Sequence, residues 1–135
     1  MADIRQVTDD FAVAPQIALE DMAEVARRGF RLVINNRPDG EAPGQPTSAQ
    51  MADAAQGAGL AYRYIPVRGG PTPGDVEAVR DAIAEAKGPV LAFCRSGTRS
   101  IVAWSMGQFA VGVRARDELI QLGRNAGYEL STVLD

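Results

Sequence analysis

Short apolar runs alternate with helical patterns along the chain, an order of elements typical of an α/β fold. We expect strands over residues 4–7, 11–14, 32–35, 61–67 and 90–93. The last of these runs is entirely apolar, as expected for a strand that is buried on both faces of a parallel sheet. The pattern therefore predicts a central, mostly parallel sheet flanked by helices on both sides.

Apolar residues at helical spacing predict the helices that cover this sheet. We expect helices over residues 17–28, 47–57, 73–87, 100–110 and 114–123, with a further one near 125–130. Thr47 and Gln50 form a capping-box pattern at the start of the second helix, and Gly29 is a stop signal for the first. The helix over 100–110 has little polar face, so we expect it to be buried, with Trp104 in the core.

The length and composition suit one soluble domain, which we expect to span residues 1–135. Hydrophobic residues make up 46% of the chain and charged residues 23%, a balance typical of folded proteins. No apolar run approaches the ~20 residues that would span a membrane, and the first residues lack the features of a signal peptide. We therefore expect a cytoplasmic protein with no membrane partner. The net charge of −3 offers no broad basic field for nucleic acid.

Two absences restrict the possible chemistry. The chain has no His, which excludes Ser–His and Cys–His catalytic pairs and every His-ligated metal site. It has a single Cys, which excludes internal disulfides, paired-cysteine redox chemistry and multi-thiolate zinc sites. A nucleophile in this chain must be activated without imidazole. The chemistry that remains implies no metal and no organic cofactor.

The segment VLAFCRSGTRS contains the candidate nucleophile, Cys94, between a buried strand and a helix. Inward-turned N–H groups of such a loop, together with the helix dipole, favour an anion. Gly97 permits a tight turn, Arg99 can bind an oxyanion with two parallel hydrogen bonds, and Ser100 can donate a hydrogen bond to the sulfur. Cysteines in such environments have pKa values of roughly 3.5–7.5 instead of about 8.5. The segment therefore predicts that Cys94 reacts as a thiolate.

A buried structural cysteine is the simpler interpretation of a lone Cys at a strand end. Two features argue against it: Arg95 and Arg99 flank Gly97, and they do so beside a helix that is otherwise apolar.

The loop sequence CRSGTRS resembles two families of enzymes. In rhodanese-type sulfurtransferases a similar loop, with four residues between the Cys and the Arg, cradles a persulfide. Cys-dependent protein phosphatases have a similar loop with five residues between them, a spacing that falls on Ser100 here. The His that usually precedes the phosphatase Cys is replaced by Phe93. The spacing of Cys94 and Arg99 therefore resembles the sulfurtransferases.

The rest of the chain resembles the phosphatases. The stretches GFRLVINNRPDGE and AYRYIPV, and the helix before VLAFC, are similar to dual-specificity-phosphatase-like domains. Over nearly its full length the chain resembles the bacterial phosphatase-like family called beta-lactamase-hydrolase-like, also described as a sulfur transferase. The resemblance implies a Cys-dependent phosphatase-like α/β fold and hydrolysis of phosphate esters through a phosphocysteine at Cys94.

Two alternatives to this function remain open. Sulfur transfer through a persulfide on Cys94 is favoured by the loop length. A non-catalytic module that binds anions for regulation is compatible with the missing His and with the lack of an Asp a few residues after the strand over 61–67. The expected partner is a phosphorylated or sulfur-donating small molecule or protein.

Residues outside the loop have both functional and structural interpretations. Phosphatases of this kind protonate the leaving group with an Asp from a separate loop, and the first carboxylate after the strand over 61–67 is Asp75. Because Thr72 and Pro73 precede it as N-cap and N1 residues, we favour a capping role and retain Asp75 as the candidate acid. Asp39 has two interpretations that the sequence leaves open: it contacts substrate, or it forms an ordinary turn with Gly40. The remaining candidates for substrate binding are Arg95, Ser96, Gly97 and Thr98 in the loop, with Arg37 and Arg68 on neighbouring strand ends.

Overall fold

Five strands form one sheet in the order β1-β2-β5-β3-β4 in the computed structural model, which describes residues 2–134. The strands are β1 (Arg5–Thr8), β2 (Phe11–Ala14), β3 (Leu32–Asn35), β4 (Ala61–Tyr64) and β5 (Val90–Phe93). Strand β1 lies at one edge and runs antiparallel to β2, whereas the other three pairings are parallel. The predicted mostly parallel sheet is confirmed.

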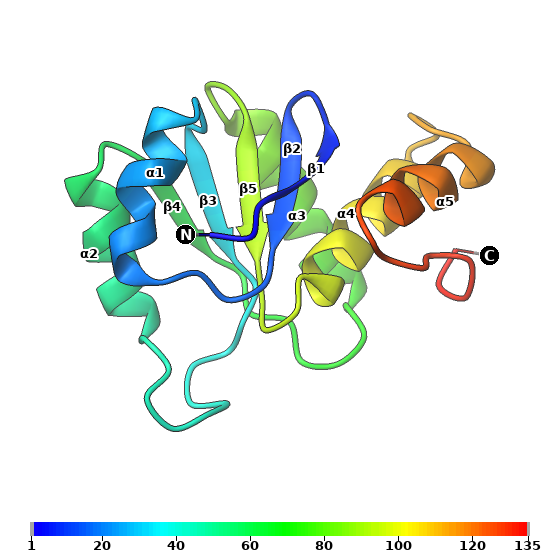
Figure 1. The fold of residues 1–135 in the computed structure, drawn as a ribbon. Coiled ribbons are helices and arrows are strands. Elements are labelled where there is room, and N and C mark those ends of the chain that lie inside the picture. The colour runs from blue at the N-terminus through cyan, green and yellow to red at the C-terminus, as the bar shows by residue number, and fades with distance from the viewer. Residues whose placement is uncertain (1, 135) are drawn as a thin grey trace.

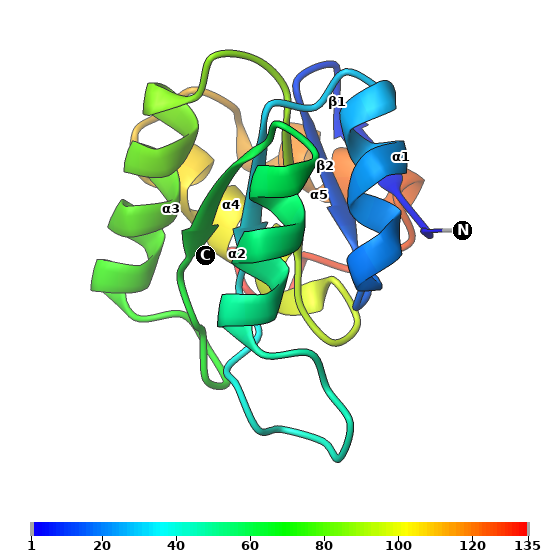
Figure 2. The same ribbon diagram turned by 90° about the vertical axis from the view of Figure 1, so that its left-hand side faces the viewer.

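Helices cover both faces of this sheet (Figures 1 and 2). The short 3-10 helix η1 (Leu19–Asp21), α1 (Met22–Arg27) and α2 (Ser48–Gly57) pack on one face. Helices α3 (Pro73–Glu85), α4 (Thr98–Ala110) and α5 (Arg116–Asn125) pack on the other. The flanked sheet predicted from the sequence is therefore correct.

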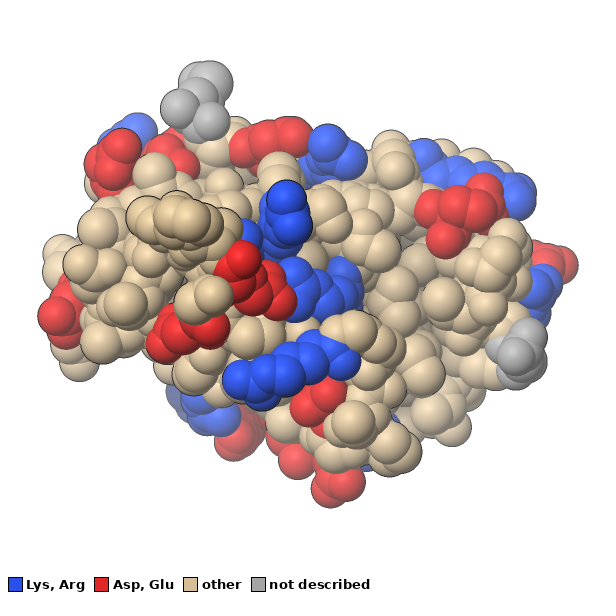
Figure 3. Space-filling view, turned by 90° about the horizontal axis from the view of Figure 1, so that it is seen from below, with Lys and Arg blue, Asp and Glu red and all other residues tan. Residues whose placement is uncertain are grey.

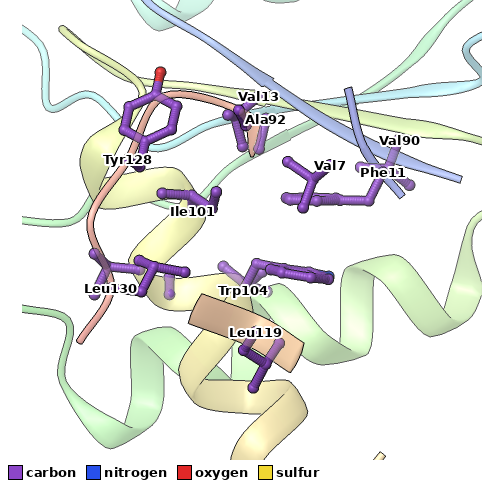
Figure 4. Packing of buried hydrophobic residues seen from close by; sticks show 14 of the residues in the cluster. Val7, Phe11, Val13, Val90, Ala92, Ile101, Trp104, Leu119, Tyr128 and Leu130 are labelled. Carbon is purple, nitrogen blue, oxygen red and sulfur yellow. The ribbon is translucent and has the colours of Figure 1, made fainter. Parts of the chain in front are cut away.

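The larger of the two cores lies between the sheet and helices α3, α4 and α5 (Figure 4). At its centre the ring of Trp104 stacks on that of Phe11, with centroids 5.0 Å apart and the planes 8° from parallel. Ile101 and Leu119 are fully buried beside this pair. The predictions that α4 is buried and that Trp104 belongs to the core are confirmed.

The central strands end together, and this places the site. Phe93 at the end of β5 pairs with Ala14 of β2 on one side and with Asn35 of β3 on the other. The segments that follow these strands therefore emerge at one edge of the sheet, the lower edge in Figure 1. The segment after β3 extends furthest from the body in both ribbon views (Figures 1 and 2).

Two elements end earlier than the sequence predicts. The strand expected over 61–67 ends at Tyr64, although the Ile65 and Val67 N–H groups still donate to the carbonyls of Asn35 and Asn36. The backbone thus follows β3 further without regular pairing. The helix expected to run to residue 87 ends at 85, because the next residue is already extended ahead of Gly88-Pro89.

The first predicted helix begins later than expected and is partly 3-10. Ala18 is extended, and its N–H donates to the Asp21 carboxylate at 2.8 Å, so regular structure begins only at Leu19. Gly29, with φ of 94°, ends the helix as predicted. Smaller shifts of two residues move the fourth helix to start at 98 and the fifth to span 116–125.

The helix expected near 125–130 does not form. Gly127 has a φ of 95° and ends α5, with its N–H donating to the Arg124 carbonyl and the Tyr128 N–H donating to the Gly123 carbonyl at 2.8 Å. These two bonds define a Schellman motif, which turns the chain back toward the sheet. Within residues 2–134, none of the helices has the length and apolar character required to cross a bilayer.

Candidate active site

The loop between β5 and α4 surrounds the sulfur of Cys94. The residue is fully buried, and the Gly97 N–H donates to its Sγ at 3.1 Å. Gly97 is the N-cap of α4, with a φ of 90° that favours glycine. The first hydrogen bond of the helix runs from the Ile101 N–H to the Gly97 carbonyl. The N–H groups of residues 98–100 precede it and have no partner within the helix. One N–H of the loop, that of Gly97, therefore donates to the sulfur, and a complete ring of donors stays a prediction.

Two contacts hold carbonyl groups of this loop from outside. The Gln16 N–H, just after β2, donates to the Arg95 carbonyl at 3.2 Å, and the Tyr128 hydroxyl donates to the Ser96 carbonyl at 2.8 Å. In a trans peptide the N–H points opposite to the C=O of the same plane. Outward-held carbonyls therefore turn the following N–H groups toward the inside of the loop, where Gly97 meets the sulfur.

The guanidinium of Arg99 already holds a carboxylate at the loop. Its Nη1 and Nη2 atoms donate to the two oxygens of Glu41 at 2.8 and 2.9 Å, and Nη1 also donates to the Val67 carbonyl at 2.8 Å. The bonds to Glu41 raise the pKa of Arg99, and the nearby Cys94 sulfur raises it further. Arg99 is thus fixed in position beside the predicted nucleophile.

These bonds leave two N–H donors of the Arg99 guanidinium without an oxygen partner. A guanidinium has five N–H donors in a fixed planar arrangement, and the three bonds above use two donors of Nη1 and one of Nη2. The remaining two, on Nε and Nη2, lie in the plane of the group along one edge, and the nearby Cys94 sulfur also interacts with this guanidinium. That pair is the edge that binds two oxygens of a phosphate or carboxylate in parallel.

Glu41 links Arg99 to a second, buried arginine. The Nε atom of Arg37 donates to Glu41 at 3.0 Å, its Nη1 donates to the Gln16 side chain at 3.1 Å, and the residue is only 6% exposed. Hydrogen bonds from Arg99 first, and then from Arg37, lower the pKa of Glu41 to about 2. Arg37 lies on the rim of the site as expected, with its guanidinium engaged by protein oxygens.

Asn36 ties three loops of this edge together. It is fully buried, and its backbone N–H donates to the Phe93 carbonyl, while its side-chain amide donates to the Ile65 carbonyl at 2.8 Å. The side-chain oxygen accepts from the Ser100 hydroxyl at 2.8 Å. The single proton of that hydroxyl is therefore directed at Asn36 here, whereas the sequence suggested that Ser100 donates to the sulfur of Cys94. Ser100 remains a predicted site residue.

The other predicted site residues lie in different positions around the loop. Ser96 and Thr98 are exposed and hydrogen-bond each other, and Arg95 is also exposed. Arg68 is exposed directly after Val67. Basic side chains gather near the middle of this face, with acidic ones beside them (Figure 3).

Asp75 is engaged at the start of α3. Its carboxylate accepts from the Thr72 N–H at 3.0 Å, and its own N–H donates to the Thr72 hydroxyl. This is the capping role favoured from the sequence, and a role as general acid stays a prediction. Within residues 2–134 no three acidic or sulfur side chains come together in a way that could hold a metal ion.

Four residues that shape the site carried no assigned role in the sequence. Glu41 and Asn36 lie in the stretch after β3 that was expected on the rim, so their polar character next to a strand end was an available signal. Gln16 contacts the site through its backbone N–H, which donates to the Arg95 carbonyl, and through its side chain, which accepts from Arg37. Tyr128 lies 32 residues beyond the Ser96 carbonyl that it holds, and no local pattern connects the two.

Comparison with known proteins identifies the family. Residues 3–111 match the family described as beta-lactamase hydrolase-like protein, phosphatase-like domain, and the chain belongs to it. The chain is 39% identical over 128 residues to the beta-lactamase hydrolase-like protein of Xylella fastidiosa strain Temecula1 and 36% identical over 126 residues to that of Agrobacterium fabrum. These matches cover 94% and 93% of the chain but only 30% and 29% of the two relatives.

Solved structures agree with this assignment. A candidate phosphatase from Neisseria meningitidis is 34% identical and superposes with a TM-score of 0.85 over 96% of this chain and 92% of its own. The active form of Tk-PTP, only 20% identical, has the same fold, with a TM-score of 0.70 over 95% of this chain and 87% of its own. The fold is that of the Cys-dependent phosphatases.

The low pKa of Glu41 predicts how its contribution to stability depends on pH. An ordinary Glu has a pKa of 4.5, whereas Glu41 has one of about 2 in the folded protein. Its ion pairs therefore stabilise the fold fully above pH 4.5, and this stabilisation is lost as the pH falls toward 2. We expect Glu41→Gln to lower the free energy of unfolding by about 1 kcal/mol at pH 7 and by progressively less below pH 4.5.

Urea unfolding of both proteins at a series of pH values measures this difference. Glu77→Gln, which removes an exposed carboxylate of α3, is the control and should show little effect at any pH. A stability difference for Glu41→Gln that is the same at pH 7 and pH 2.5 would contradict the assigned ion pairs.

Proposed function

We propose that this domain hydrolyses phosphate monoesters, with Cys94 as the nucleophile and Arg99 as the group that binds the phosphoryl oxygens. The observation that carries the proposal is the edge of the Arg99 guanidinium formed by Nε and Nη2, where two N–H donors have no oxygen partner. The guanidinium is fixed beside Cys94 by Glu41 and Val67, and it keeps two parallel donors for an oxyanion. Family membership supports the same chemistry.

The proposed reaction has two steps. The thiolate of Cys94 attacks phosphorus, and the bond between phosphorus and the ester oxygen breaks. Its electron pair goes to the ester oxygen, which takes a proton from water or from the candidate acid Asp75. Water then attacks the phosphocysteine and gives one proton to solvent, the S–P bond breaks with its electron pair on sulfur, and inorganic phosphate and the thiolate are released. Arg99 and the N–H groups at the start of α4 stabilise the charge on the non-bridging oxygens in both steps.

Protonation of the leaving group determines the best substrates. The capping bond of Asp75 to the Thr72 N–H holds the candidate acid at the start of α3. An aryl oxygen leaves more easily as an anion than an alkyl oxygen and depends less on an acid. We therefore propose aryl phosphates as the preferred substrate class. The chain spans about 30% of the length of its curated relatives, so this activity is proposed for the domain.

Substitution of the two loop arginines tests the role of Arg99. We expect Arg99→Lys to lower kcat/KM for an aryl phosphate by about 100-fold, because a lysine cannot supply two parallel donors. Arg95→Lys is the matched control in the same loop, and its smaller effect follows from the exposure of that side chain. Equal losses in the two variants, measured by steady-state kinetics, would contradict the division of roles.

Sulfur transfer is the second candidate function, and it is favoured by the number of residues between Cys94 and Arg99. Only four residues separate Cys94 from Arg99, and α4 begins within them at Thr98. A persulfide requires room for one additional sulfur, whereas a phosphoryl group requires donors for three oxygens. In this reaction the thiolate attacks the outer sulfur of thiosulfate, sulfite leaves, and the persulfide sulfur passes to an acceptor thiol.

Inserting one glycine after Gly97 separates the two candidate functions. We expect the longer loop to raise turnover of aryl phosphates and to lower sulfur transfer from thiosulfate, because it widens the ring of donors around the sulfur. Both rates are measured on the same preparations, with Cys94→Ser as the blank. If the native loop hydrolyses phosphate esters efficiently and the insertion abolishes this, the effect assigned to loop length is wrong.

A further inference from the structure

The C-terminal segment brings the hydroxyl of Tyr128 into contact with the loop that follows Cys94. The Schellman motif at the end of α5 fixes the backbone of Tyr128 through its N–H bond to the Gly123 carbonyl. A side chain at Gly123 would lie 2.7 Å from Leu130 and 3.1 Å from the Tyr128 carbonyl. The chain after α5 is therefore packed tightly at the point that sets the direction of Tyr128.

The ring of Tyr128 belongs to the core, and its hydroxyl points out of it. The residue is 8% exposed, and its ring packs in the cluster that also contains Ile101 and Leu130 (Figure 4). The Arg5 guanidinium lies 5.2 Å from the ring centroid. Burial raises the pKa of Tyr128, the charge of Arg5 lowers it, and the nearby Cys94 sulfur raises it; the net direction is upward. The hydroxyl therefore stays protonated and acts as a donor at neutral pH.

Contact between Tyr128 and the loop is very close. A Cβ atom on Gly97 would lie 2.2 Å from the Tyr128 hydroxyl oxygen and 3.0 Å from the ring carbon that bears it. Glycine at 97 is thus required by this contact as well as by its φ of 90°. The two residues fit each other, although 31 positions separate them in the chain.

A single peptide plane connects the hydroxyl to the sulfur. Tyr128 donates to the Ser96 carbonyl at 2.8 Å, and the N–H on the opposite side of that peptide, from Gly97, donates to the Cys94 sulfur at 3.1 Å. Because the peptide is planar, holding one side fixes the direction of the other. A bond to the carbonyl also polarises the N–H and strengthens its own bond.

We propose that Tyr128 is a positioning residue for the nucleophile: its hydroxyl orients the Ser96–Gly97 peptide so that the Gly97 N–H stabilises the Cys94 thiolate. The proposal rests on the role of Cys94 as the nucleophile in the proposed function. It also assigns a task to the chain beyond residue 111, where the match to the phosphatase-like family ends.

The pH dependence of Cys94 alkylation tests this role. Rates with iodoacetamide are measured from pH 4 to pH 10 for the wild type and for Tyr128→Phe, which keeps the buried ring and removes the donor. Cys94 is fully buried, so access of the reagent affects the absolute rate, whereas the midpoint of the profile reports the thiolate. Arg99 also interacts with the sulfur and is unchanged in both proteins.

We expect the midpoint of Tyr128→Phe to move up by about 0.5–1 pH unit, with alkylation below the midpoint slowed about threefold to tenfold. Glu129→Gln is the control: it breaks the exposed pair with Arg124 beside Tyr128 and contacts no loop residue through that pair. An unchanged midpoint in Tyr128→Phe, or equal shifts in both variants, would overturn the proposal. Thermal unfolding of each variant shows whether the fold is kept.

A second variant covers the case in which Tyr128→Phe does not fold. Site-specific 3-fluorotyrosine at 128 makes the phenol a stronger donor with little change in shape, so the midpoint should move down. A midpoint that stays the same or moves up would overturn the proposal. Turnover of an aryl phosphate is measured separately on the wild type: its absence would refute the proposed function, while the midpoint shifts would still decide the role of Tyr128.

Discussion

The candidate site depends on one constraint: the peptide group between Ser96 and Gly97 must turn its N–H toward the Cys94 sulfur. The loop between Cys94 and α4 cannot hold this arrangement alone, because its carbonyls then point outward and need partners of their own. The structure supplies these partners from distant parts of the chain. Gln16 after β2 holds one carbonyl, and Tyr128 after α5 holds the next. The candidate site is therefore a property of the whole fold rather than of a seven-residue motif.

The charged part of the site follows the same logic. Arg99 can bind an oxyanion with two parallel donors only if its long side chain is fixed, and Glu41 and the Val67 carbonyl fix it at three points. Arg37, which is nearly buried, donates to Oε1 of Glu41, the same oxygen that accepts from Nη2 of Arg99. The free donors are thus arranged before any ligand arrives, which lowers the entropic cost of binding one.

The sequence predicted the features that depend on local pattern. The sheet, the burial of α4 and the position of Cys94 between strand and helix all followed from hydrophobic spacing and from one short motif. It failed where tertiary contacts decide: the expected helix after α5 is replaced by the turn at Gly127, and the same turn delivers Tyr128 to the loop. Glu41 was visible on the rim, but its pairing with Arg99 depends on a segment 58 residues away and has no local signature.

The chemistry at Cys94 is tested most directly by trapping what becomes attached to its sulfur. The protein is mixed with an aryl phosphate, quenched in acid within milliseconds and weighed intact; a parallel sample is mixed with thiosulfate. The account predicts that the aryl phosphate adds one phosphoryl group, which is absent from Cys94→Ser. A mass that is unchanged by the aryl phosphate and raised by one sulfur atom with thiosulfate would contradict it, and sulfur transfer would then be the activity of this domain.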